Sequence, residues 1–511
     1  MLADSPVPTA SRRSFDRDLW LLIALATAKF VFHIWANGQY GFHRDELQTI
    51  SDGRHIDWGF VAYPPLTAFL GRIEWSLFGA SVAGIRFFPA LAQSIVFVVC
   101  GLMARRLGGG RAAMLLTAFA VALAPVSLSA SSLFMYVSFD YLWYVLAAYF
   151  VICRIESGDA RWWLAIGAAI GLGLMTKYTM AFFAAGIVAG ALFTPLRSDL
   201  RSKWLWCGVA LSSLIFLPHL VWQVSHDFVT LDFLKYIHAR DVRIGRADGF
   251  YVDQFNNIST NLLTVPLWLL GLGYAIFGGR GKYCVIAWMA IVPFAIIALA
   301  KGRGYYTAPL YPMLFALGAV VFQRWLDARR TPAARRAGWS AVAALLILAI
   351  VVVPVVVPLV PVNSAHWAFV NAKNSDFREE LGWPELTREV ARIWNGLTPE
   401  ERAHGGIWGS NYGEAGALEL YGPQYGLPQV ISAVNSFWLR GPPHPVPEVM
   451  IVVGASRKDL DQPCTTVELA GHTGNEAHVE NEETKWHPDI FICRGVRKPL
   501  DELWPKLIEF G

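Results

Sequence analysis

Charged residues are scarce in this 511-residue sequence, at 16%, whereas soluble domains carry about a quarter. With 55% hydrophobic residues, the composition therefore indicates a membrane protein. The sequence also lacks a P-loop, zinc-like Cys/His spacing, internal repeats and any low-complexity tract beyond the Val/Pro run at 351–361. These absences argue against a P-loop nucleoside triphosphatase, a zinc-finger-like site and a repeat architecture.

Long apolar runs dominate the first two thirds of the chain. A spanning helix needs about 20 apolar residues, and we count about eleven spans between Leu19 and Pro361. A small-residue stretch at 24–28 resembles a signal peptide, but apolar sequence resumes after Lys29, which favours an uncleaved anchor. The expected spans are 19–36, 84–104, 112–128, 132–152, 162–175, 178–194, 204–224, 261–278, 283–300, 307–323 and 339–361.

Lysine and arginine recur in every second connection, as expected for cytoplasmic loops. If the N-terminus is cytoplasmic, an odd number of spans leaves the tail and the two large loops, 37–82 and 225–260, on the opposite side. The basic residues in these connections are Arg12, Arg13, Arg17, Arg105, Arg106, Arg111, Arg154, Arg161, Arg197, Arg201, Lys203, Arg280, Lys282, Arg324, Arg329, Arg330, Arg335 and Arg336.

The tail has the pattern of a small α/β domain. We therefore divide the chain into a membrane domain over 1–361 and an α/β domain over 362–511. The residues 375–380, followed by 386–394, predict an amphipathic helix with a Ser/Glu start signal, and 449–453 and 489–493 predict strands. Cys464 and Cys493 could form a disulfide in an oxidising compartment or remain two unpaired core cysteines, and the sequence leaves both open.

Two adjacent carboxylates, Asp45 and Glu46, follow the first span. Solvated loop charge is the plain interpretation of such a pair, because Asp and Glu are mostly exposed. However, cationic and aromatic residues gather in the same loop, which favours a site that binds a substrate. They are Arg44, Arg54, His55 and Tyr63.

Charges also lie where a membrane protein rarely carries them. Asp140 lies in the outer half of the fourth span, where an ionisable residue costs about 2.5–3.5 kcal/mol at the bilayer centre and indicates function. Lys177 lies in a very short connection on the outer side, against the usual distribution of lysine, so it needs a partner or reaches the lipid phosphates. The same reasoning applies to Lys235, Arg240, Arg243, Arg246, Lys301 and Arg303.

Outer carboxylates and cations together fit one kind of reaction. A phosphate leaving group needs positive charge as its bond breaks, and an acceptor hydroxyl or amine needs a general base. Transfer from a phosphate carried on a membrane lipid meets both needs and explains why the enzyme is embedded.

The order of these motifs over roughly residues 15–325 resembles the bacterial relatives of protein O-mannosyltransferases and lipid A aminoarabinose transferases, which have the GT-C fold. The matching motifs are Asp45-Glu46, Pro64-Pro65-Leu66, Asp140, Met175-Thr176-Lys177-Tyr178 and Gly304-Tyr305-Tyr306 with Pro309. Segments 416–424 and 435–441 of the tail are similar to segments in other bacterial members.

The resemblance implies a glycosyltransferase with a polyprenyl-phosphate sugar donor, Asp45 as the base, and inversion at the anomeric carbon. Glu46 would orient the loop or the acceptor, and Asp140 would assist acceptor binding or hold a cation. The donor phosphate would be bound by residues drawn from Lys177, Arg44, Arg240, Arg243, Arg246, Lys301 and Tyr306, and the rest of the substrate by His55, Tyr63, Arg303 and Tyr305. The aminoarabinose transferases typically have Glu-Lys before this proline, whereas this chain has Ala62-Tyr63, which counts against aminoarabinose as the sugar.

The resemblance also implies a multi-pass protein of the bacterial inner membrane, with its site and tail facing the periplasm. We expect a monomer that meets membrane lipids and binds no nucleic acid, with the acceptor left open among lipid, polysaccharide and protein. No cofactor is expected; a divalent cation on Asp45, Glu46 and His55 is the alternative, although their spacing matches no standard site.

The same features also fit two other classes of protein. A secondary transporter or flippase would also carry intramembrane charge, and a receptor or scaffold could use the tail to bind cell-wall material. Tyr421 and Trp438 could stack on sugar, but packed core aromatics are the simpler interpretation.

Overall fold

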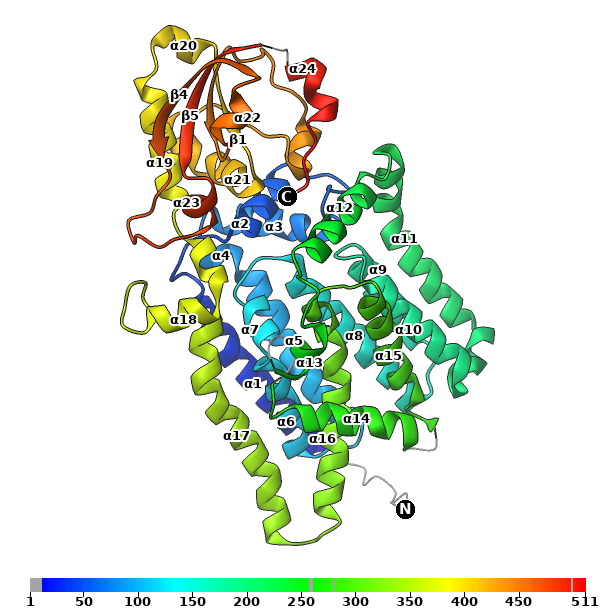
Figure 1. Ribbon diagram of the computed structural model, residues 1–511. Helices are drawn as coiled ribbons and strands as arrows, with labels where there is room; N and C mark the ends of the chain where they lie inside the picture. Colours follow the sequence, from blue (N-terminus) through cyan, green and yellow to red (C-terminus); the bar gives the residue numbers. More distant parts are fainter. Residues whose placement is uncertain (1–11, 257–260, 279–280, 498–499) are drawn as a thin grey trace.

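The computed structural model describes residues 12–256, 261–278, 281–497 and 500–511, so that Arg280 and residues 257–260 of the second loop lie outside the described residues. Figure 1 shows a helical bundle with a mixed α/β domain at one end, and the connection between α16 and α17 at the opposite end.

Every expected span coincides with a helix. The helices are α1 (Arg12–Ala36), α5 (Phe87–Arg106), α6 (Arg111–Ala122), α8 (Tyr136–Ser157), α9 (Trp162–Leu174), α10 (Met180–Phe193), α11 (Lys203–Ser225), α14 (Val265–Phe277), α15 (Cys284–Leu299), α16 (Tyr311–Asp327) and α17 (Pro332–Val356). In lipid every backbone N–H and C=O needs a partner within the chain, and a helix supplies these partners locally.

Lengths divide these helices into two groups. In the described part of the chain, six helices are long and apolar enough to cross a membrane, and α10 with the 3₁₀ helix η1 (Pro195–Arg201), bent by 99°, makes a seventh if counted as one span. Four shorter apolar helices, α6, α9, α14 and α15, have 10–17 residues. At 1.5 Å per residue, 13 residues reach only about 20 Å of a core that is about 30 Å thick. A multi-pass membrane protein is therefore clear, and the count of about eleven spans stays a prediction.

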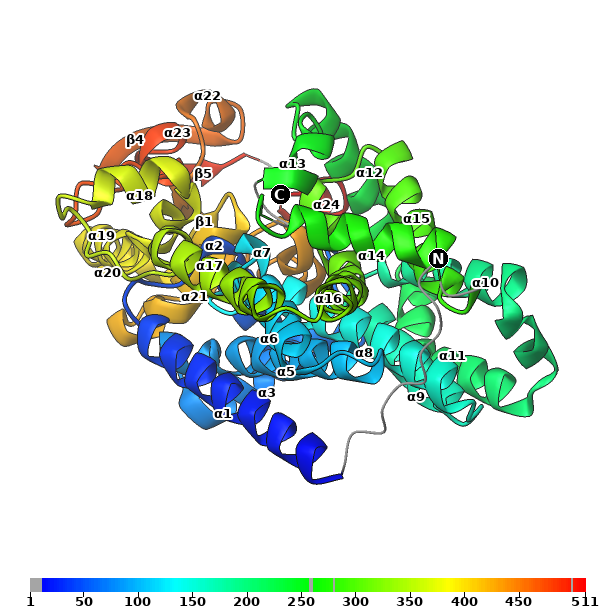
Figure 2. The ribbon, with the colours of Figure 1, turned by 90° about the horizontal axis from the view of Figure 1, so that it is seen from below.

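The centre of the bundle is closely packed. Figure 2 shows α5, α6, α8 and α16 in the interior, with α1 and α11 toward its edges. Small residues allow the helix backbones to approach one another, as is common in membranes: a Cβ atom at Gly318 of α16 would lie 1.8 Å from the carbonyl oxygen of Leu267 on α14.

The two large loops fold into helices of their own. The first contains α2 (Arg44–Arg54), α3 (Leu66–Phe78) and α4 (Val82–Ile85), and the second contains α12 (Val229–Arg243) and α13 (Phe250–Asn256). A 3₁₀ helix, η3 (Gly304–Leu310), precedes α16.

The tail forms the predicted α/β domain around a five-stranded sheet of order β2-β1-β3-β5-β4. Its strands are β1 (Gly405–Gly409), β2 (Val430–Ile431), β3 (Val449–Val453), β4 (Cys464–His472) and β5 (Asp489–Val496). Strand β1 is parallel to β2 and β3, whereas β5 is antiparallel to β3 and β4. The Cys464–Cys493 disulfide joins β4 to β5, so the paired alternative is the one that the structure adopts.

Three helices of this domain matter for the site: α19 (Trp383–Gly396), α21 (Tyr412–Tyr421) and α23 (Glu482–Trp486). The helix predicted from Ser375 is wrong in its start, because residues 375–380 form a separate 3₁₀ helix capped by Asn374. Gly382, with φ of +98°, breaks the chain there, and Pro384 in the first turn of α19 cannot continue a preceding helix.

The tail aromatics pack within the domain. Trp438 donates its indole N–H to the Trp504 carbonyl at 2.8 Å, and Trp504 donates to the Trp438 carbonyl at 2.9 Å. Tyr421 packs against the main hydrophobic core. These contacts favour the core interpretation for both residues.

Candidate functional site

Asp45 lies in the first turn of α2, at the junction of the bundle and the C-terminal domain. His43 caps this helix: its Nδ1 accepts from the Asp45 amide at 3.2 Å, and its own amide donates to Glu46 Oε2 at 2.8 Å. The Asp45 side chain is 35% exposed, and its Oδ1 accepts a hydrogen bond from Tyr412 Oη at 2.7 Å. Oδ2 lies 3.9 Å from His43 Nδ1, too far for a hydrogen bond. One oxygen of this carboxylate is thus held and the other is open.

Glu46 is a carboxylate of the opposite kind, with no exposed side-chain surface. Arg86 donates to it twice, from Nε at 2.8 Å and from a terminal nitrogen at 2.6 Å, and the Phe134 amide donates at 2.7 Å. Arg86 also donates to the carbonyls of Asn37 and Gly41 and to Glu380. Glu46 therefore fastens the start of α2 to the bundle, which agrees with a role in orienting the loop.

Lys177 lies in the turn between α9 and α10, inside a cage of tyrosine rings. Its ammonium is 3.9 Å from the ring centre of Tyr306, 5.1 Å from Tyr136 and 5.3 Å from Tyr305. Aromatic faces attract a cation without neutralising its charge. Within the described ranges no carboxylate lies within 4.0 Å of this ammonium, so no ion pair neutralises it there.

A second group of cations surrounds Asp241 of α12. Arg303 Nε donates to Asp241 Oδ2 at 2.6 Å, and Arg240 and Arg246 lie at 3.6 Å and 3.8 Å from Oδ1. Three arginines thus lie around one carboxylate. Because Arg303 immediately precedes η3, which carries two of the cage tyrosines, this group adjoins Lys177.

Asp140 lies on α8, one turn after the cage residue Tyr136. It is buried, and Thr179 Oγ1 lies 3.5 Å from its Oδ2, at the limit of a hydrogen bond. Asp140 and Lys177 interact electrostatically, and the charge of Asp45 also acts on Tyr136. The structure thus gathers Asp45, Asp140, Lys177 and the arginines at one end of the bundle.

The other residues predicted for the site have different surroundings. Arg44 forms an ion pair with Glu482 of α23 and lies 4.9 Å from the Tyr412 ring centre, facing the C-terminal domain. His55 faces Glu419 at 3.4 Å, Tyr63 donates to buried Asp52, and burial raises the pKa of Asp52 to about 7. Arg243 and Lys301 are exposed.

Four residues of this region were missed from the sequence: Tyr136, Asp241, Arg86 and Tyr412. The spacing of four residues between Tyr136 and Asp140 on one helix face was a usable signal. Tyr412 carried none, because 367 residues separate it from Asp45.

The sequence left a divalent cation on Asp45, Glu46 and His55 as an alternative. Among the residues that the structure describes, no group of three His, Cys, Asp or Glu side chains could hold a metal ion. Glu46, one of the three donors considered from the sequence, has its oxygens engaged by Arg86 and by backbone amides.

Comparisons with known proteins agree on one fold. The model of the dolichyl-phosphate-mannose-protein mannosyltransferase family matches residues 62–222. The lipid A galacturonosyltransferase RgtD of Rhizobium johnstonii is 23% identical over 369 residues, covering 69% of this chain and 72% of the relative. An undecaprenyl phosphate-alpha-4-amino-4-deoxy-L-arabinose arabinosyl transferase of Pseudomonas fluorescens is 26% identical over 278 residues, covering 49% of this chain and 48% of the relative.

Solved structures extend the likeness to nearly the whole chain. ArnT from Cupriavidus metallidurans aligns over 93% of this chain and 97% of its own, at 15% identity, with a TM-score of 0.57 in the apo state and 0.54 when bound to undecaprenyl phosphate. Mycobacterial arabinofuranosyltransferase AftD aligns over 96% of this chain and 40% of its own, at 12% identity and a TM-score of 0.50. The fold that the sequence motifs indicated is confirmed.

Proposed function

We propose that the chain is a glycosyltransferase of the GT-C superfamily and that it moves a sugar from a polyprenyl-phosphate donor to a lipid acceptor. Asp45 is the general base, and the reaction inverts the anomeric carbon. A glycan or protein acceptor and a transport role are the alternatives that the experiments below exclude or reveal. The proposed location is the inner membrane, with the site and C-terminal domain facing the periplasm and the chain acting as a monomer.

One observation carries this proposal: an open carboxylate oxygen and an unneutralised lysine occupy the same end of the bundle. Asp45 Oδ2 has no hydrogen-bond partner within the described chain, and Lys177 is surrounded by aromatic rings. A base and an anion site are the two groups that transfer from a phosphate requires.

The proposed step follows from these positions. The acceptor hydroxyl gives its proton to Asp45 Oδ2 while its oxygen attacks the anomeric carbon from the side opposite the phosphate. The bond between that carbon and the phosphate oxygen breaks, and its electron pair leaves on the phosphate. Lys177 and Arg303 stabilise the charge that collects there, in a site where fixed cations need no reorganisation.

Glu46 and Asp140 support this step without taking the proton. Glu46 holds the first turn of α2, and hence Asp45, against the bundle through Arg86. Burial lowers the pKa of Lys177, and the charge of Asp140 offsets part of this lowering. Catalysis is proposed to need no metal, since Glu46 is committed to Arg86.

The sugar is proposed to differ from aminoarabinose. In this chain the position before Pro64 holds Tyr63, which is buried and donates its hydroxyl to Asp52. A Glu-Lys pair at that point, typical of the aminoarabinose transferases, would replace the Tyr63 hydroxyl in this contact by a lysine.

Glycolipid mass spectrometry of cells with and without the gene tests the proposal. We expect one glycolipid to lose the mass of one sugar in the deletion, and to regain it with the wild-type gene but not with Asp45→Asn. Unchanged lipids together with a changed glycan or glycoprotein would show that the acceptor is that glycan or protein and not a lipid. Proteoliposomes that move the lipid-linked sugar across the bilayer without transferring it would favour the flippase alternative.

A further inference from the structure

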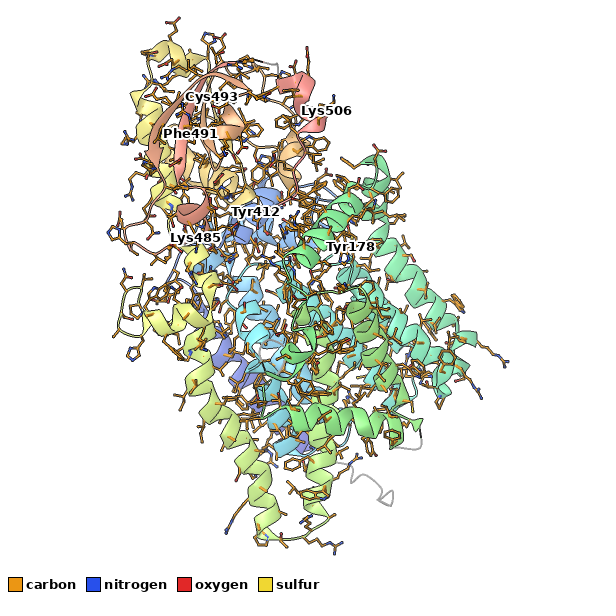
Figure 3. All side chains as sticks on the ribbon, in the orientation of Figure 1. Tyr178, Tyr412, Lys485, Phe491, Cys493 and Lys506 are labelled. Atoms are coloured by element: carbon orange, nitrogen blue, oxygen red, sulfur yellow. A yellow bond between two sulfur atoms is a disulfide. The ribbon has the colours of Figure 1, made fainter. Side chains whose placement is uncertain are left out.

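The C-terminal domain sends one side chain onto the proposed base. Tyr412 is the first residue of α21, and Figure 3 shows it at the base of this domain, beside α2. Its hydroxyl donates to Asp45 Oδ1 at 2.7 Å, which is the side-chain hydrogen bond that Asp45 accepts in the described structure.

Two glycines set α21 directly against α2. A Cβ atom at Gly416 would lie 2.8 Å from the backbone carbon of Leu47, and one at Gly413 would lie 3.1 Å from Arg44 Cβ. Contacts under 3.0 Å do not occur between real atoms of this kind, so the close crossing depends on Gly416. The start of α21, with Tyr412, is therefore fixed relative to the start of α2.

The Tyr412 ring is held on its face as well. Arg44 lies 4.9 Å from the ring centre and is itself paired with Glu482 of α23. Asn411 caps α21 by accepting from the Glu414 amide at 3.0 Å, and donates to both oxygens of Glu483. Elements α21 and α23 thus position this tyrosine from two sides.

The protonation state of Tyr412 suits a donor. Burial, followed by the neighbouring charge of Asp45, raises the pKa of Tyr412 far above its ordinary value. The hydroxyl consequently keeps its proton throughout the working pH range. With Oδ1 occupied by this donor, the carboxylate plane is fixed and Oδ2 remains for the acceptor.

We propose that Tyr412 is the positioning residue for the base, and that the C-terminal domain is therefore part of the active site. This inference rests on the proposed role of Asp45. A carboxylate already held by one hydrogen bond loses less orientational freedom when the acceptor binds. A base misplaced by even 1 Å can lower the rate by about 100-fold.

The test uses the full-length protein in nanodiscs, supplied with the total lipid extract of cells that lack the gene. We expect Tyr412→Phe to lower kcat by about 10-fold to 100-fold, the range for a hydrogen bond to a charged group, with the KM of the acceptor little changed.

A double-mutant cycle separates positioning from a general structural effect. If Tyr412 acts through Asp45, Tyr412→Phe has no further effect in the Asp45→Asn background. Tyr425→Phe, in the same domain and without a contact to Asp45, is the matched control and keeps wild-type kcat. The thermal unfolding temperature of each purified variant checks that it folds.

The outcomes are distinct. Tyr412→Phe with wild-type kcat overturns the inference, as does an equal loss in the Asp45→Asn background. Failure of the wild-type protein to convert the extract, or full activity of Asp45→Asn, overturns the proposed function itself.

Discussion

Replacing Arg86 by methionine tests how the site is anchored. Arg86 is fully buried and donates five hydrogen bonds: two to Glu46, one to Glu380, and one each to the carbonyls of Asn37 and Gly41. Methionine fills most of the volume but leaves two buried carboxylates without their cation. Removing one partner of a buried ion pair costs about 3–5 kcal/mol, and we expect that loss in the free energy of unfolding.

Titration of the purified protein with a denaturing detergent measures this change. Arg72→Met is the control, because Arg72 is exposed on α3. The double variant Arg86→Met with Glu46→Gln should recover part of the stability, since it removes one uncompensated charge. Transfer activity should stay low in the double variant, because α2 has lost its anchor. A stability of Arg86→Met within about 1 kcal/mol of wild type would refute the anchoring argument, since that falls well below the expected penalty.

Four further predictions concern the site and its surroundings. Asp45→Asn should fold and insert normally but lower kcat by about 10²–10⁴, measured as sugar transfer in proteoliposomes; near-normal turnover would exclude it as the base. Lys177→Met should weaken binding of the sugar-free polyprenyl phosphate, measured by fluorescence titration, and unchanged affinity would remove it from the donor site. Chelation with EDTA should leave transfer unchanged, whereas loss restored by one divalent ion would establish a metal. Burial raises the pKa of Asp52 from 3.8 to about 7, so the folded state binds a proton more tightly than the unfolded state; stability should fall as pH rises from about 4 to 7, and less so in Asp52→Asn.

The membrane part could be predicted well because its physical signal is local. Apolar runs long enough to meet lipid form helices wherever they occur, and each expected run coincides with one. Strand β3 occupies Val449–Val453, as predicted, because a short β-branched run leaves few alternatives. The start of α19 was predicted wrongly because two helix starts lie within a few residues. Asn374 caps a short 3₁₀ helix at 375–380, and Gly382 with Pro384 begins α19 soon after it.

The candidate site could be predicted only in part. Asp140 and Lys177 could be recognised as charges in unusual places, and Asp45 by the cationic and aromatic residues in its loop. The structure brings these three residues to one end of the bundle. The partners of these residues depend on packing between distant segments. The sequence near Glu46 does not indicate that Arg86 donates hydrogen bonds to it. The sequence near Tyr412 likewise does not indicate its hydrogen bond to Asp45.

The distance along the chain between Asp45 and Tyr412 has a consequence for how the molecule is made. Asp45 leaves the ribosome near the start of synthesis, whereas its donor follows 367 residues later, after every apolar helix of the bundle has been translated. When the last of these helices has been translated, Asp45 therefore still lacks its Tyr412 donor. The proposed base gains its Tyr412 donor last, when α21 docks on α2.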